Sequence, residues 1–198
     1  MVNSETSEEA GVQMTMDYVL ARLATCFGQK ADNFADFMAM GLRAEGWYAT
    51  EAVRYLAGPA AGNVVKVEQV RGPAQGDTGF NPDLQLNIGG QSYQLAIKPM
   101  LLQGEAGISH YFSQELPGLF RWLDNLRGRA ALLTIAFPCS TGDKEWTNAV
   151  GEAESAYGVK IAGQTEFVVP RPPLPMVKAC IALWRHSSVV PSTEDSAG

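Results

Sequence analysis

The chain has 198 residues, of which 46% are hydrophobic and 18% charged, as expected for one globular domain with enough apolar material for a core. Its net charge of -6 excludes a protein that coats nucleic acid through overall charge, but not an enzyme that meets DNA through a local basic patch and a bound metal. The sequence has no membrane-length apolar run, no secretory signal and no CxxC pair among its three cysteines. We therefore expect a cytoplasmic protein without membrane association.

Both ends of the chain are polar and lack apolar periodicity. Residues 1–12 and 187–198 are rich in Ser, Thr, Glu and small residues, a composition typical of disorder. The sequence thus predicts two disordered tails around a single domain at residues 13–186.

The first part of this domain predicts three helices. Apolar residues recur at helical spacing over residues 14–28 and again over residues 33–44. A third, short helix is expected to begin at Thr50, whose hydroxyl can cap it, and to end at Gly58.

The middle of the chain predicts a three-stranded meander. NVVKVEQVRG, residues 63–72, is rich in β-branched residues and alternates as a strand does. After a loop rich in Gly and Pro, PDLQLNIGGQSYQLAIKP, residues 82–99, predicts a tight hairpin.

The remaining elements alternate between helix and strand. Residues 109–127 predict a helix broken at its Pro-Gly pair, and residues 130–139 form the continuous apolar run of a strand buried on both faces. We expect a helix at 144–158, a pair of strands or one broken strand at 159–172, and a terminal helix at 173–186. This order is typical of an α/β fold, a mixed β-sheet flanked by helices.

The predicted hairpin brings polar side chains together. If Gly89-Gly90 is a two-residue turn, counting across it places the apolar pairs on one face. On the other face Asp83 then lies opposite Ala96, with Lys98 two residues further along.

Carboxylates at both 83 and 96 would repel each other unless a divalent cation lay between them. Mg²⁺ accepts such oxygen ligands and keeps several waters, and a nearby lysine can orient the attacking water. This chemistry hydrolyses phosphodiesters. At position 96, however, the chain has alanine.

PD at 82–83 and AIK at 96–98 resemble the PD-(D/E)XK nuclease motif, with Ala96 in place of the motif's Asp or Glu. This superfamily includes restriction endonucleases, Holliday-junction resolvases and DNA-repair nucleases. Across residues 47–170 the predicted order of helix, three-stranded meander, helix and strand also resembles its core. The resemblance implies a restriction-endonuclease-like fold.

The resemblance also implies roles for individual residues. Asp83 would be a metal ligand, the Ile97 carbonyl a second ligand and Lys98 the catalytic lysine. Glu51 would join them from the helix before the meander, and Ala96 would occupy the place of the missing ligand. The implied cofactor is Mg²⁺ or Mn²⁺, and the implied partner is DNA, bound by a homodimer or a larger nucleoprotein assembly.

Ala96 has three explanations. It is an engineered replacement of a catalytic glutamate, a natural loss that leaves a nuclease-like binding protein, or a sign that the carboxylate has moved to another element, for instance to Glu51 or Glu68. The intact surroundings, notably Lys98, favour the first explanation.

Each candidate residue also has a purely structural explanation. Asp83 could mark the entry to a strand, Lys98 could protect a sheet edge, and Glu51 could complement a helix dipole.

Arg121, Arg127 and Arg129 are the one local concentration of basic residues. They could contact phosphates, although a solvated helix face explains them more simply.

The leading hypothesis is a metal-dependent DNA nuclease disabled at position 96. The alternative is a catalytically dead binding or assembly module on the same fold. A third reading is an unrelated α/β domain in which the hairpin is only structural.

Overall fold

The computed structural model describes residues 4–42, 44–57, 65–69, 82–88, 90–103, 106–170 and 177–189. Its helices are α1 (Ser4–Gln29), α2 (Ala31–Met40), α3 (Glu45–Leu56), α4 (Ile108–His110), the π-helix η2 (Tyr111–Glu115), α5 (Leu116–Leu126), α6 (Lys144–Tyr157) and the 3-10 helix η3 (Ser187–Val189). Its strands are β1 (Val65–Gln69), β2 (Leu84–Ile88), β3 (Gln91–Leu101), β4 (Ala130–Phe137), β5 (Val159–Val169) and β6 (Val177–His186). None of the helices in these ranges is both long and apolar enough to cross a lipid bilayer.

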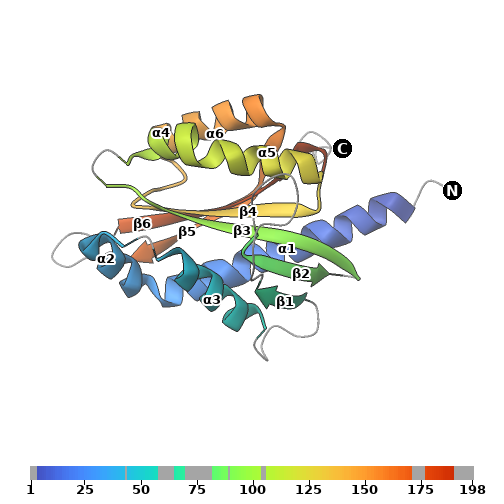
Figure 1. The fold of residues 1–198 in the computed structure, drawn as a ribbon, viewed down its shortest axis with the longest axis horizontal. Helices are drawn as coiled ribbons and strands as arrows, with labels where there is room; N and C mark the ends of the chain where they lie inside the picture. Colours follow the sequence, from blue (N-terminus) through green and yellow to red (C-terminus); the bar gives the residue numbers. More distant parts are fainter. Residues whose placement is uncertain are drawn as a thin grey trace.

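The strands form one six-stranded mixed sheet in the order β1-β2-β3-β4-β6-β5, between two layers of helices (Figure 1). β1, β2 and β3 form an antiparallel meander, and β4 lies parallel to β3. Because neighbouring parallel strands need a crossover, the chain passes through α4, η2 and α5 before it enters β4. The predicted α/β class with a mixed sheet and flanking helices is confirmed.

Each face of the sheet has its own hydrophobic core. On one face the sheet packs against α1, α2 and α3, whose aromatic residues Phe27, Phe34 and Tyr48 are fully buried. On the other face it packs against α4, η2, α5 and α6, where Trp122 and Trp146 are buried. The two tryptophans are therefore packing residues, as their helical spacing predicts.

The hairpin register agrees with the prediction from counting across the turn. Leu84 pairs with Leu95, and Leu86 pairs with Tyr93. Gly90 has the positive φ of 83° that such a turn requires, which favours glycine there, whereas Gly89 lies outside the described residues.

The helix boundaries at the N-terminal end differ from the prediction. α1 already begins at Ser4, so residues 4–12 of the expected disordered tail are helical, in a segment where glutamate and alanine favour helix. Likewise, α3 begins at Glu45 rather than at Thr50. The Thr50 hydroxyl is not a cap: it donates to the carbonyl of Gly46 one turn earlier, at 2.8 Å.

The expected terminal helix at 173–186 is wrong. Residues 177–186 are β6, which pairs antiparallel with β4 on one side and with β5 on the other. A strand in the middle of a sheet is apolar on both faces, and periodicity alone does not separate such a run from a buried helix. β5 is one strand with an irregularity between Ile161 and Gly163, close to the expected broken strand.

The break expected at the Pro-Gly pair of the helix at 109–127 is not found there: Pro117 and Gly118 lie inside α5, and a π-helix precedes them. η2 separates α4 from α5, and Pro117 lies in the first turn of α5. Residues 187–189 of the expected C-terminal tail form η3, and the rest of that tail lies outside the described residues.

Candidate functional site

The predicted site lies where β2 begins beside the middle of β3. The last pair in the ladder is Leu84 with Leu95, whereas β3 continues to Leu101. Asp83 stands immediately before β2, and its backbone N–H donates to the Leu95 carbonyl at 3.0 Å. Its Oδ2 accepts the backbone N–H of Ile97 at 2.7 Å. The Asp83 carboxylate is therefore held against the part of β3 that contains the motif.

Position 96 lies inside the protein. Ala96 is 1% exposed and belongs to the same core as Met100 and the helices α4 to α6. Ile97 points to the opposite core, as alternation along a strand requires. A longer side chain at position 96 would thus begin in an apolar environment.

Lys98 is the centre of a charged cluster. Its Nζ lies 2.8 Å from Oε1 of Glu45, the first residue of α3, and 2.8 Å from Oε2 of Glu115, the last residue of η2. The Lys98 and Glu115 side chains are 16% and 18% exposed, whereas that of Glu45 is 51% exposed. His110 adds a ring nitrogen 3.7 Å from Oε1 of Glu115. One lysine therefore joins elements from both helical layers.

The charges in this cluster act on one another. Burial raises the pKa of Asp83, the hydrogen bond from Ile97 lowers it, nearby Glu45 raises it and Lys98 lowers it, with a net increase. Burial acts to lower the pKa of Lys98, but its hydrogen bonds to Glu115 and Glu45 outweigh burial, so this pKa is raised. Two carboxylates thus bind one ammonium group, which keeps its proton, and that charge in turn acts on the nearby Asp83 carboxylate.

Glu45 and Glu115 are the residues that sequence reasoning missed. Glu45 precedes the predicted start of its helix, and Glu115 stands 17 positions after Lys98. Neither belongs to a short motif. Only the approach of α3 and η2 to the part of β3 that extends beyond β2 brings them to Lys98.

Glu51 does not join this cluster. Its carboxylate binds Lys30 at 3.0 Å and lies 4.0 Å from Arg54. An α-helix turns about 100° per residue, so a side chain six positions after Glu45 points roughly 240° around α3. Glu51 therefore faces α1 rather than β3.

The three arginines are exposed, Arg121 in the middle of α5 and the other two just after its end. Arg127 has a positive φ of 37° at the C-cap of α5. Among the residues that the structure describes, no ion pair joins Arg121 or Arg129 to the Lys98 cluster. Their exposure agrees with a solvated surface and leaves them accessible to a ligand.

Within the described ranges, no three or more His, Cys, Asp or Glu side chains are grouped so that they could together hold a metal ion. Mg²⁺ commonly binds through one or two carboxylates and keeps several waters, and the excess negative charge around Lys98 fits that pattern.

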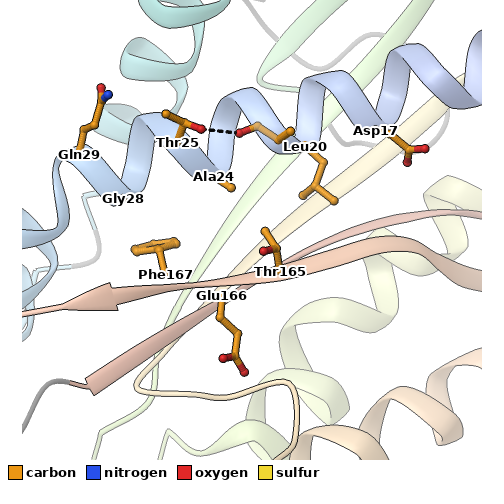
Figure 2. A pocket seen from close by; sticks show the side chains of 10 residues that line it. Asp17, Leu20, Ala24, Thr25, Gly28, Gln29, Thr165, Glu166 and Phe167 are labelled. Atoms are coloured by element: carbon orange, nitrogen blue, oxygen red, sulfur yellow. Dashed lines mark hydrogen bonds between the residues drawn. The ribbon is translucent and has the colours of Figure 1, made fainter.

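A separate groove of about 570 Å³ lies between α1 and β5. Leu20 and Gly28 of α1 face Thr165 and Phe167, whereas Glu166 points to the other side of the strand (Figure 2). None of the candidate residues lines this groove, so it is distinct from the Lys98 cluster.

Comparisons with protein-family models, with curated proteins and with solved structures find no match to this chain.

Proposed function

We propose that the protein is a metal-dependent DNA nuclease of the PD-(D/E)XK type in which Glu115 provides the carboxylate that position 96 lacks. The observation that carries this proposal is the contact of 2.8 Å between Glu115 and Lys98, on a strand to which Asp83 is hydrogen-bonded. Of the three explanations for Ala96, this geometry supports a carboxylate that has moved to another element. That element is η2, and not the position of Glu51.

The fold supports the same proposal. α3, the meander of β1 to β3, the crossover helices and the parallel strand β4 follow the order of elements that the resemblance implies. The agreement extends to the register of the hairpin, which puts the PD and AIK segments side by side.

Each residue of the cluster has a distinct task in this proposal. Asp83 and Glu115 would hold the metal ion, and half-exposed Glu45 would complete the negative environment. Bound Mg²⁺ or Mn²⁺ polarises the phosphate and lowers the pKa of its bound water. Because the pKa of Lys98 is raised, its ammonium group acts as a cation that orients water or phosphate, and not as the general base.

Cleavage of supercoiled, linear duplex and single-stranded DNA with Mg²⁺ or Mn²⁺ tests the proposal. We expect the unchanged chain to cut at least one form. Glu115→Gln and Asp83→Asn should each lower the rate by roughly 10- to 100-fold or more. Glu51→Gln is the matched control, since it neutralises a carboxylate on α3 that binds Lys30 instead, and it should keep the rate of the unchanged chain.

Ala96→Glu separates the explanations of position 96. If the Ala96→Glu variant cleaves DNA and the unchanged chain does not, the missing ligand belongs at position 96 and Glu115 does not replace it. Absence of metal-dependent cleavage in both proteins, with intact circular dichroism, would overturn the nuclease assignment.

A nuclease-like binding module is the second candidate, favoured by the net charge of -6 and by the burial of Ala96. For this function we expect the protein to bind DNA or another protein without cleaving DNA. Glu115→Gln should leave that binding unchanged.

A further inference from the structure

A serine, a histidine and an aspartate form a chain of polar contacts away from the Lys98 cluster. His186 ends β6, Ser188 lies in η3 directly after it, and Asp124 comes from α5. Nδ1 of His186 lies 2.6 Å from the Ser188 Oγ, and its Nε2 lies 3.2 Å from Oδ1 of Asp124. This is the connectivity of a hydrolytic triad, with the two ring nitrogens exchanged relative to the arrangement in serine proteases.

The direction of these hydrogen bonds is set by the backbone. The N–H of Ser188 donates to Nδ1 of His186 at 3.1 Å, so Nδ1 carries a lone pair and not a proton. The Ser188 hydroxyl lies 2.6 Å from the same nitrogen, so its O–H and the backbone N–H share the one lone pair of Nδ1. The ring proton is then on Nε2, which lies 3.2 Å from Oδ1 of Asp124. The imidazole is thus held in the tautomer that accepts a proton from the serine.

The turn that carries Ser188 is fixed on both sides. The N–H of Ser187 donates to the carbonyl of Gly158 at 2.9 Å. A Cβ on Gly128 would meet Val189 at 2.8 Å, which shows how closely the end of η3 packs on the turn after α5. The His186 side chain is 16% exposed, whereas Ser188 is exposed. The His186 imidazole is therefore held beside a hydroxyl group that molecules in solution can reach.

We propose that Ser188 is a nucleophile for acyl transfer, with small carboxylic esters as the substrate class. The Ser188 Oγ attacks the ester carbonyl carbon while its proton passes to Nδ1 of His186. The carbon–oxygen bond to the alcohol then breaks, and the leaving oxygen takes that proton. Water, deprotonated by the same nitrogen, hydrolyses the acyl-serine and returns the serine hydroxyl. Asp124 stabilises the imidazolium that forms in each half-reaction. The open position of Ser188 suits small, activated esters that need no deep acyl pocket.

The test uses the full chain with a fluorophosphonate probe and with p-nitrophenyl acetate. We expect the probe on Ser188, located by peptide mass spectrometry, and no labelling there in Ser188→Ala. His186→Gln should slow both reactions by about 100-fold or more. Ser187→Ala is the matched control, because Ser187 is held through its backbone N–H, and it should react like the unchanged chain. Removal of divalent metal ions with EDTA should leave both reactions unchanged, which separates this site from the proposed nuclease site.

A second measurement is independent of any substitution. The nitrogen-15 shifts of His186 in the neutral ring should show the proton on Nε2, and a proton on Nδ1 would overturn the proposal. Lack of labelling at Ser188 in the unchanged chain would also overturn it, as would equal labelling in correctly folded His186→Gln.

Discussion

The negative charge of Asp83 destabilises the folded protein. Its pKa is raised, by burial first and then by Glu45, so the folded protein binds this proton more tightly than the unfolded chain does. Stability therefore falls as pH rises from the ordinary pKa of an aspartate through the raised value, and the penalty is fully present above that window. Such a cost is typical of residues kept for function rather than for stability.

Asp83→Asn should accordingly increase the free energy of unfolding at pH 7. The amide oxygen of asparagine can still accept the Ile97 N–H, while the buried negative charge is removed. The increase should disappear below the ordinary pKa range of aspartate, where Asp83 is protonated in both states. Urea unfolding at the two pH values measures this, and a less stable variant at pH 7 would contradict it.

The two glutamates that bind Lys98 should differ in their contribution to stability. Glu115→Gln removes a largely buried charge partner and should cost about 2 kcal/mol. Glu45→Gln removes a half-exposed partner and should cost roughly 0–1 kcal/mol, since water screens that pair. Thermal or urea unfolding of both variants measures the difference, and equal losses would show that burial does not separate the two pairs.

Among the elements, the π-helix has the greatest effect on the candidate site. η2 lies between α4 and α5, and Glu115 is its last residue before the turn that contains Pro117. π-Helical turns are rare in proteins, but those that occur are often found at functional sites. The sequence predicts a break at Pro117 and Gly118, and not the π-helix before them that brings Glu115 to Lys98.

The packing of α1 on β5 gives a prediction at the scale of two elements. A Cβ on Gly163, at the irregularity of β5, would lie 2.9 Å from a methyl group of Leu20. Gly163→Ala should therefore destabilise the protein only slightly, by up to about 1 kcal/mol, because the methyl group that must move is at the end of the flexible Leu20 side chain.

Gly151→Ala is the control for that substitution. Gly151 lies in α6, is exposed, and has no atom within 4 Å of the added Cβ. The alanine should stabilise α6 by about 0.5–1 kcal/mol. Thermal unfolding of the two variants should show shifts of opposite sign, and a stabilised Gly163→Ala would contradict the close contact.

At the scale of the whole molecule, two hydrophobic cores share one sheet. β3, β4 and β6 contribute side chains to both faces, so neither helical layer can lose its packing without exposing the sheet that the other layer uses. The two layers should therefore unfold together.

Trp47→Phe makes this cooperativity measurable. Trp47 packs against the core of α1 to α3, whereas the other three tryptophans belong to the core of α4 to α6. In the variant, tryptophan fluorescence reports one layer and far-ultraviolet circular dichroism reports the whole fold. The two urea transitions should coincide, and separate midpoints would show that the layers unfold independently.

The sequence by itself determined the elements that have strong local signals. The glycine turn fixed the hairpin register, the apolar run of β4 identified a strand buried on both faces, and helical spacing identified α1, α5 and α6. From the register alone Asp83, Ala96 and Lys98 could be placed together. These features depend on neighbours in the chain, where steric limits and side-chain alternation act directly.

The tertiary structure decided everything that depends on long-range contacts. β6 is a strand because β4 and β5 flank it, although its residues also suit a helix. Glu45 and Glu115 lie at Lys98, and Glu51 at Lys30, because α3 and η2 pack against the part of β3 that β2 leaves unpaired. His186 meets Asp124 because the end of β6 lies beside α5. Such contacts between distant segments form only when the two cores pack, so no local pattern in the sequence encodes them.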